Sequence, residues 1–236
     1  MTSKRFLITG GSQGIGAALV TQARAAGHAV LFTGRDAAAV ERLAAETGAF
    51  GVSADVGKAA DNARTVEAAM ARLGGVDVLV NNAGLGHRAP LLSADTALWR
   101  EMLELNLLAL CICTREAVKD MRARGGEGYV IHVSSMAAHR VPPGSGVYAA
   151  SKFGVRALTE ALRQELHEAR LPIRVSAISP GYVETEFAAI YNKSEEAARQ
   201  TYGRHKVLEA DDIAAAVVYL LSQPPHVQVH DVLMRA

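Results

Sequence analysis

The strongest constraint on the fold is a regular alternation of short apolar segments with longer segments of helical periodicity. Most short segments are apolar without strict alternation, which is typical of parallel strands covered on both faces. The predicted strands are Arg5–Thr9, Ala29–Thr33, Ala49–Ala54, Val76–Val80, Gly128–Ser134, Ile173–Ile178 and Val227–Leu233. The predicted helices are Gly14–Ala26, Asp36–Thr47, Ala59–Leu73, Thr96–Arg124, Val147–Ala169 and Asp211–Ser222. This order predicts an α/β fold with right-handed crossovers and a doubly wound parallel sheet.

The 236 residues contain neither an internal repeat nor a Pro/Gly/Ser-rich linker, so we expect one domain over residues 1–236. The 25 basic and 24 acidic residues are interspersed and leave a net charge of +1. This balance argues against a nucleic-acid or membrane partner. The N-terminus shows no signal-peptide core, and no uncharged apolar stretch approaches membrane-spanning length, so we expect a cytoplasmic protein.

The two cysteines, Cys111 and Cys113, lie two residues apart in an apolar stretch. Residues at that spacing point to different faces of a helix. A metal site would require more ligands at other spacings, so we predict no metal. We interpret both as buried, reduced thiols.

The predicted helix Thr96–Arg124 is apolar on more than one face. Its apolar residues include Leu98, Trp99, Met102, Leu103, Leu105, Leu107, Leu108, Leu110, Cys111 and Ile112. A surface helix has one apolar stripe, whereas this helix requires cover on two sides. The sheet can cover one side. A second subunit is the simplest cover for the other, although a neighbouring element of the same chain is the alternative.

A glycine-rich segment joins the first predicted strand to the first helix, with the sequence Thr9-Gly10-Gly11-Ser12-Gln13-Gly14-Ile15-Gly16. Glycines let the backbone approach a pyrophosphate, and the free N–H groups at a helix start bind the anion. The spacing Thr-Gly-x-x-x-Gly-x-Gly is a variant of the dinucleotide-binding turn. An ordinary tight turn is the alternative. We take Gly10, Ser12, Gln13, Gly14, Ile15 and Gly16 as candidate cofactor contacts.

The end of the second predicted strand carries Arg35 and Asp36, about 20 residues after the glycines. At this position an acidic side chain holds a ribose 2′-hydroxyl, whereas an arginine accommodates a 2′-phosphate. Asp36 precedes three alanines and is also a natural helix N-cap. We therefore favour Arg35 as a 2′-phosphate ligand and NADP(H) over NAD(H), with a solvated arginine as the alternative.

Further motifs follow the later strands in a fixed order. They are Asp55-Val56, Asn81-Asn82-Ala83-Gly84, Asn106, Ser134-Ser135, Tyr148-Ala149-Ala150-Ser151-Lys152 and Pro180-Gly181-Tyr182-Val183-Glu184-Thr185. Each motif is modest alone, but in this order the chain resembles the short-chain dehydrogenase/reductase family over nearly its whole length. The resemblance implies a Rossmann-type fold, an NAD(P)-dependent hydride transfer on a small-molecule carbonyl or alcohol, and a homodimer or homotetramer.

The resemblance also implies roles for individual residues. Asp55 and Val56 would flank the adenine, and Asn82 would stabilise the strand end beneath the cofactor. Asn106 would hold a water that passes protons to Lys152, which would also hold the nicotinamide ribose. The remaining implied cofactor contacts are Ala83, Gly84, Pro180, Gly181, Val183 and Thr185.

Tyr148 and Lys152 stand four residues apart and share one face of the predicted helix. A free tyrosine has a pKa of about 10, too high for efficient acid–base catalysis near neutral pH. A nearby ammonium should lower that pKa. We therefore assign Tyr148 as general acid/base. The resemblance implies that Ser135, rather than Ser134, falls at the family's spacing before the tyrosine, and it would stabilise charge on the substrate oxygen.

Substrate contacts are expected from Gly86–Ser93, Met136–Gly146 and Tyr182–Lys206, the last (182–206) forming a mobile lid. His87, Arg88, His139 and Arg140 fall in or beside these loops, where they border an acidic substrate or are simply solvated. His132 lies inside a strand and is expected to be a hydrogen-bonded structural histidine.

Two other function classes stay open. One is a non-catalytic NADP-binding sensor, which the intact Ser135, Tyr148 and Lys152 argue against. The other is a sugar-nucleotide epimerase or dehydratase, for which the C-terminal part is short. The ending from Pro224 to Met234 is similar to the family branch acting on small 3-hydroxy acids such as serine.

Overall fold

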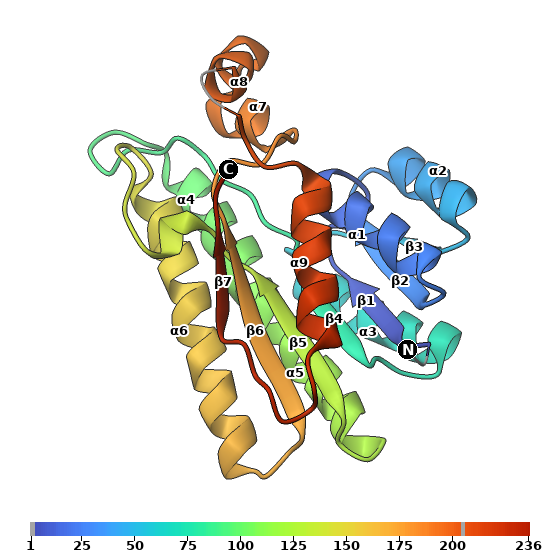
Figure 1. The fold of residues 1–236 in the computed structure, drawn as a ribbon. Helices are drawn as coiled ribbons and strands as arrows, with labels where there is room; N and C mark the ends of the chain where they lie inside the picture. The colour runs from blue at the N-terminus through green and yellow to red at the C-terminus, as the bar shows by residue number, and fades with distance from the viewer. Residues whose placement is uncertain (1–2, 204–205) are drawn as a thin grey trace.

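The structure is a computed structural model that describes residues 3–203 and 206–236. Seven parallel strands form one sheet in the order β3-β2-β1-β4-β5-β6-β7 (Figure 1). Their bounds are β1 Arg5–Ile8, β2 Ala29–Gly34, β3 Phe50–Ser53, β4 Val78–Asn81, β5 Gly128–Val133, β6 Ile173–Pro180 and β7 Asp231–Met234. The predicted doubly wound, single-domain α/β fold is confirmed. The strand order switches at β1: β2 and β3 are added on one side of it, and β4 to β7 on the other. The crevice between β1 and β4 at this switch point is where such sheets bind ligands.

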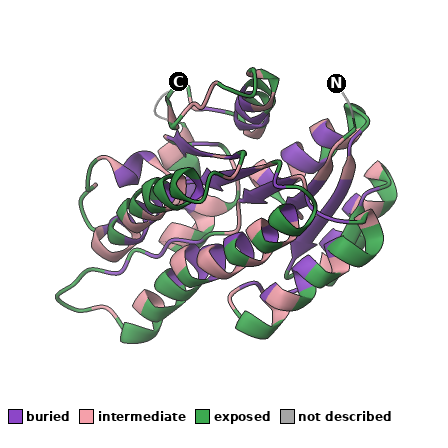
Figure 2. Cartoon of the chain, turned by 90° about the horizontal axis from the view of Figure 1, so that it is seen from below, coloured by how far each residue is buried: buried purple, intermediate pink, exposed green. Residues whose placement is uncertain are grey.

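Helices cover both faces of the sheet. One face packs against α1 (Gly14–Ala25), α2 (Ala37–Thr47) and α9 (Ala210–Ser222). The other packs against α3 (Ala59–Leu73), α5 (Ala109–Ala123) and α6 (Gly146–Glu168). The five central strands (β1, β2, β4, β5 and β6) are almost wholly buried, whereas the edge strands β3 and β7 and the outer helix faces are more exposed (Figure 2). Double cover explains why the central strands are continuously apolar.

The prediction of a single helix over Thr96–Arg124 is wrong in one respect. The segment forms α4 (Thr96–Leu103), a π-helical turn at Glu104–Leu108, and then α5. A π turn inserts an extra residue into the helical repeat and is frequent at functional sites. The run of leucines shows no glycine or proline that would mark this break.

Two strand starts also differ from the prediction. The segment before Asp231 runs beside β6, and the His230 carbonyl accepts from the Ala177 N–H at 2.9 Å. Before His230, side chains take the place of ladder bonds: Gln228 Nε2 donates to the Val175 carbonyl at 3.0 Å, and Ser176 Oγ donates to the Val229 carbonyl. Similarly, the Val76 N–H donates to the Asp120 carboxylate at 2.8 Å instead of to a strand. The short last strand thus begins at Asp231 and the fourth at Val78.

Candidate active site

The glycine turn between β1 and α1 forms a concave stretch of backbone, here called the cradle. Side chains at its glycine positions would occupy this space. Gly10 has φ +63° and Gly14 has φ +52°, a region that favours glycine. A Cβ at Gly16 would lie 2.1 Å from the Gly10 carbonyl oxygen. Among the described residues, no side chain caps the start of α1. Its first-turn N–H groups are therefore free for an anion, and this cradle fits a dinucleotide pyrophosphate.

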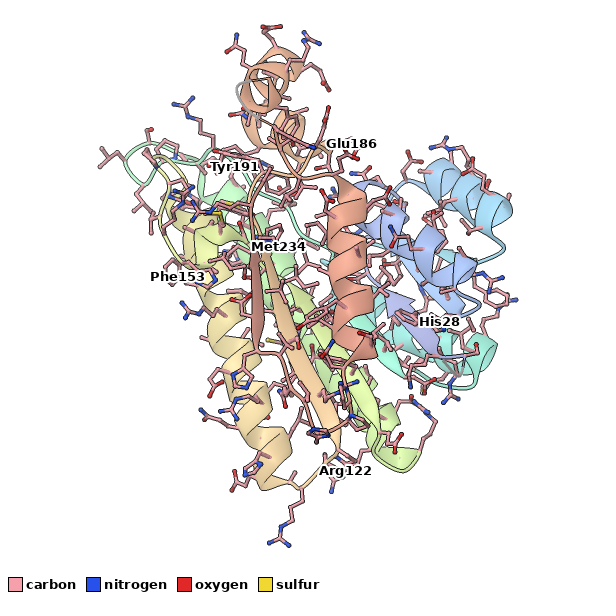
Figure 3. The ribbon with its side chains drawn as sticks, in the orientation of Figure 1. His28, Arg122, Phe153, Glu186, Tyr191 and Met234 are labelled. Carbon is pink, nitrogen blue, oxygen red and sulfur yellow. The ribbon has the colours of Figure 1, made fainter. Side chains whose placement is uncertain are left out.

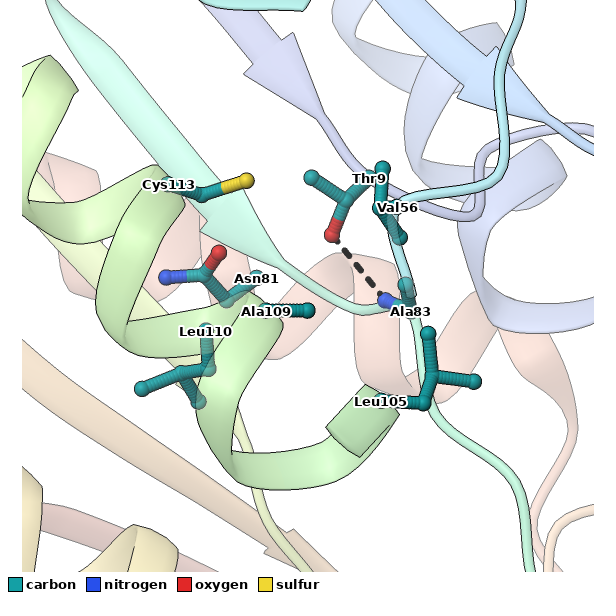
Figure 4. Close-up of a pocket in the computed structure, with 8 residues that line it drawn as sticks. All are labelled: Thr9, Val56, Asn81, Ala83, Leu105, Ala109, Leu110 and Cys113. Atoms are coloured by element: carbon teal, nitrogen blue, oxygen red, sulfur yellow. Dashed lines mark hydrogen bonds between the residues drawn. The ribbon is translucent and has the colours of Figure 1, made fainter. Parts of the chain in front are cut away.

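Asn82 and Thr9 lock the ends of β4 and β1 together under this cradle. Asn82 Nδ2 donates to the Thr9 and Gly10 carbonyls at 3.1 and 2.8 Å. The Thr9 hydroxyl accepts from the N–H groups of Asn82 and Ala83, both at 3.1 Å. Figure 4 shows Thr9 and Ala83 at a small buried cavity. Asn82 thus makes the strand-end hydrogen bonds that the resemblance implied. Thr9 opens the glycine-rich motif, but no role for its hydroxyl was predicted from the sequence.

Around that cavity, Asp55 and Val56 follow β3. Val56 contributes an apolar wall beside Ala83 and Leu105. The Asp55 carboxylate accepts from the Gly57 N–H at 3.1 Å, and the Val56 carbonyl accepts from Asn62 Nδ2 at 2.5 Å. These bonds hold the turn rigid at the carboxyl edge of the sheet.

Arg35 and Asp36 play different structural parts at the end of β2. The Asp36 carboxylate caps α2 by accepting from the N–H groups of Ala38 and Ala39 at 3.0 and 3.2 Å. The Arg35 side chain is 59 % exposed, and its Nη1 lies 3.9 Å from Oε1 of Glu101 on α4. The guanidinium is thus free to meet a further anion. Glu101 was missed by sequence reasoning because it lies on a distant helix.

Tyr148 and Lys152 lie on the first turns of α6, beside the end of β5. Lys152 is buried, and its Nζ donates to the Val133 carbonyl at 3.0 Å. The same Nζ lies 6.0 Å from the centroid of the Tyr148 ring. Ser135, the cap of the short 3-10 turn Met136–Ala138, lies next to the phenol. The structure therefore brings Ser135, Tyr148 and Lys152 together.

The pKa of Tyr148 differs in direction from the sequence-based prediction. We expected Lys152 to lower it, but burial raises the pKa of Tyr148 to about 12, and the Ser135 hydroxyl opposes that rise. Burial also lowers the pKa of Lys152 to about 8. Both shifts favour the neutral form of each group, as expected where water is excluded.

Asn106 lies in the π-helical turn and ties it to the loop after β4. Its Oδ1 accepts from the Leu85 N–H at 2.9 Å, and its Nδ2 donates to the Leu85 carbonyl at 2.8 Å. Nδ2 also donates to Ser151 Oγ on α6 at 3.0 Å. One buried amide thus joins three segments around Lys152. A second lone pair on Oδ1 is left to accept from a water.

Within the described part of segment 182–206, α7 (Phe187–Asn192) packs over Tyr148 and is followed by α8 (Glu195–Tyr202). The ring centroids of Phe187 and Tyr191 lie 5.6 and 6.0 Å from that of Tyr148. Gly86 allows this approach, since a Cβ there would lie about 3 Å from all three rings. Residues 204 and 205 of the predicted lid lie outside the described residues. In Figure 3, Tyr191 and Glu186 lie at one end of the molecule and Arg122 at the other.

The Pro180–Thr185 motif forms the other border of the glycine turn. Pro180 ends β6, and the Gly181 N–H donates to the Met234 carbonyl at 2.8 Å. Val183 forms a β-bridge with Leu208. A Cβ at Gly14 would lie 3.1 Å from the Thr185 methyl group. The cradle is therefore open on one side and bordered by Thr185 on the other.

His87, His132 and His139 each contact groups other than Tyr148. His87 Nε2 contacts Glu101 Oε2 at 2.8 Å, and His139 Nε2 contacts Asp231 Oδ2 at 2.9 Å. His132 bonds Thr159 and Thr114 through its two ring nitrogens at 2.9 and 3.3 Å, and burial lowers its pKa to about 3. His132 is a structural histidine, as predicted.

The two arginines beside these histidines are exposed. A Cβ at Gly144 would lie 3.9 Å from Arg88 Nε, so Arg88 reaches the loop before α6. Of the two free cysteines, Cys113 is buried, whereas Cys111 is only partly buried, contrary to the prediction. Burial raises the pKa of the Cys113 thiol to about 12.

The described residues contain neither a metal-binding cluster nor a membrane-spanning helix. Within residues 3–203 and 206–236, no group of three or more His, Cys, Asp or Glu side chains is arranged to hold a metal ion. In the same part of the chain, no helix has the length and hydropathy needed to cross a bilayer.

Comparison with known proteins gives consistent matches. A family model described as short chain dehydrogenase matches residues 4–196. The "Dehydrogenase/reductase SDR family member 11" of Bos taurus is 45% identical over 97% of this chain and 94% of its own length. The "Farnesol dehydrogenase" of Aedes aegypti is 38% identical over 98% of this chain and 95% of its own length.

Among solved structures, a closed form of serine dehydrogenase complexed with NADP+ superimposes with a TM-score of 0.92 at 30% identity, covering 98% of this chain and 94% of that one. A 3-ketoacyl-(acyl-carrier-protein) reductase from Brucella melitensis complexed with NADH gives a TM-score of 0.86 at 33% identity, covering 98% of this chain and 96% of that one.

Proposed function

Because the chain belongs to the short-chain dehydrogenase/reductase family of oxidoreductases, we propose that it transfers a hydride between NADP(H) and a carbonyl or secondary alcohol. The observation that carries this proposal is the cluster of Ser135, Tyr148 and Lys152 at the carboxyl edge of the sheet, beside an anion-binding glycine turn. A turnover assay with NADPH and NADH over a panel of carbonyls and alcohols tests it. We place the enzyme in the cytoplasm, where free thiols stay reduced.

The cofactor would lie along the carboxyl edge of the sheet. The first-turn N–H groups of α1 would bind its pyrophosphate, and Arg35 its 2′-phosphate. Asp55 and Val56 would flank the adenine, and Lys152 would hold the nicotinamide ribose. When bound, NADP(H) supplies or accepts the hydride, and its oxidised ring adds a positive charge.

In the reductive direction, Tyr148 donates its phenolic proton to the carbonyl oxygen while a C–H bond forms at the carbonyl carbon. Burial keeps this phenol protonated at neutral pH, and the nearby Lys152 ammonium together with the positive charge of an oxidised cofactor ring would lower its pKa for proton transfer. Ser135 hydrogen-bonds the same oxygen and stabilises its developing negative charge. The buried Lys152 ammonium then favours return of a proton to Tyr148 through a water held at Asn106.

Phe187 and Tyr191 shield Tyr148 from solvent. We propose that segment 182–206 opens to admit substrate and closes for the chemical step. Closure excludes water, which strengthens each hydrogen bond to the reacting oxygen. A non-catalytic NADP-binding sensor would need neither a proton donor nor a closing segment. Measurable turnover would therefore distinguish an enzyme from a sensor.

The first prediction concerns the choice of cofactor. The contact of Arg35 with a 2′-phosphate is worth about 1.5–3 kcal/mol as a charge-assisted hydrogen bond. Arg35→Asp should therefore reverse or abolish a preference for NADPH over NADH, measured as dissociation constants by fluorescence titration. Arg42→Asp, an exposed arginine on α2, is the matched control and should keep the preference. Equal affinities of the wild type for the two cofactors would remove the basis for this assignment.

The second prediction concerns the proton donor. Tyr148→Phe keeps the ring packed against Phe187 and Tyr191, so fold and NADPH binding should survive. Turnover should fall about 10²–10⁴-fold, since general acid–base transfer contributes that much. Ser135→Ala should lose a similar or smaller factor, whereas Lys152→Met should also weaken cofactor binding. Retention of more than about a tenth of wild-type turnover by Tyr148→Phe would contradict the mechanism.

The third prediction concerns assembly. Leu103, Leu108 and Phe153 expose 41, 53 and 40 % of their surface on α4, the π turn and α6. In Figure 3, Phe153 points outward from α6. We propose a homodimer or homotetramer that buries this face, because an exposed apolar face marks an interface. Light scattering at micromolar concentration should give a multiple of 24.9 kDa, and a monomer mass would exclude the proposal.

A further inference from the structure

An apolar groove lies between the loop after β4 and the loop before α6. Its lining residues are Pro90, Leu91, Val141, Pro142, Pro143, Gly144 and Gly146, none of them polar or charged. Its volume of about 350 Å³ falls within the range of small-molecule sites, about 300–1,000 Å³. Leu91 and Val141 expose 67 and 63 % of their surface, and the adjacent Leu92 is fully exposed.

The loops that line the groove border the site around Tyr148. One wall ends at Gly146, the first residue of α6, which carries Tyr148 on the same turn. The Arg88 N–H donates to the Tyr191 carbonyl at 3.1 Å, and Arg88 Nε lies near Gly144. The loops that form the groove thus touch the lid over Tyr148, and they lie side by side next to α4 (Figure 1). Its prolines restrict the backbone, so the groove is formed before a ligand arrives.

We propose that this groove binds the apolar part of the substrate, so that the enzyme acts on ketones or secondary alcohols carrying an extended hydrocarbon chain. The inference rests on the proposed oxidoreductase function and names its substrate class. A small polar substrate would leave this surface wet, whereas a hydrocarbon chain would bury it. Association would then gain from each methylene removed from water.

A homologous series of methyl ketones from 2-butanone to 2-nonanone tests the proposal. Each methylene that the groove covers should raise kcat/KM by about two- to fourfold. Leu91→Ser and Val141→Ser should flatten this dependence, so that kcat/KM no longer rises from 2-butanone to 2-nonanone. Met70→Ser, a 41 % exposed apolar residue on α3, is the control and should keep the dependence. No rise with chain length, or a preference for short hydroxy acids, would overturn the proposal.

A binding experiment without cofactor separates failure of the groove from failure of the oxidoreductase function. Calorimetry should detect 2-nonanone binding that Leu91→Ser weakens, whether or not the ketone is reduced. Chain-length-dependent binding without turnover would retain the groove and remove the proposed reaction. If Leu91→Ser instead altered the oligomer mass and left 2-nonanone binding intact, the groove would be a subunit interface and the proposal would fall.

A second, independent observation concerns Glu101. One carboxylate oxygen contacts His87 Nε2 at 2.8 Å, and the other faces Arg35 at 3.9 Å. The His87 ring is buried, so it fixes the carboxylate beside the guanidinium. We infer that Glu101 is a specificity-determining residue that weakens the preference of Arg35 for a 2′-phosphate. The carboxylate competes for the guanidinium and repels the phosphate across a solvated gap.

Two cofactor fragments test this inference without any reaction, namely adenosine 2′,5′-bisphosphate and AMP. Glu101→Gln should tighten binding of the bisphosphate about two- to fivefold at low ionic strength and leave AMP unchanged, with the gain fading as salt rises. Glu104→Gln, which removes a charge paired with Arg100 on the next helical turn, should change neither affinity. An unchanged or reduced bisphosphate affinity in Glu101→Gln would overturn the inference. Loss of selectivity in Arg35→Ala would show separately that Arg35 reads the phosphate.

Discussion

The close contact between the ends of β1 and β4 is the constraint on which the rest of the site depends. Gly16 must lack a side chain because the Gly10 carbonyl occupies the place of its Cβ. Asn82 then satisfies that same carbonyl together with the Thr9 carbonyl, which would otherwise be left inside without a partner. A few hydrogen bonds from the Asn82 amide to the backbone thus fix the start of α1 relative to the loop after β4.

A second constraint links this region to Tyr148 and Lys152. The π turn places Asn106 where its amide bonds Leu85 on one side and Ser151 on the other. Since Ser151 precedes Lys152, the amide sets the position of α6 against the loop that follows β4. A regular α-helix would shift the residues on one side of this turn by one position and could not satisfy both partners. The irregular helix therefore helps to position the proposed catalytic residues and is not a packing defect.

Much of the fold and of the site could be predicted from the sequence, because it depends on local signals. Parallel strands covered on both faces show as apolar runs, and the glycine turn and the Tyr148–Lys152 spacing are fixed by backbone geometry. Contacts between distant segments left no such signal. The π turn lies in a leucine-rich stretch that is compatible with regular helix, and the contacts of His87 with Glu101 and of His139 with Asp231 appear only after folding. The last strand was placed too early because Gln228 and Ser176 replace ladder bonds with side-chain bonds.

The pKa values of Tyr148 and Lys152 show why these residues and a bound cofactor would be needed together. Burial favours the neutral phenol of Tyr148 and lowers the pKa of Lys152 to about 8, so the protein alone holds the proton on Tyr148. Oxidation of an alcohol requires the phenolate, which a positive charge nearby stabilises. The protein supplies one such charge at Lys152, and an oxidised nicotinamide would add another beside it. The preferred direction of proton transfer at Tyr148 would then follow the redox state of the bound cofactor.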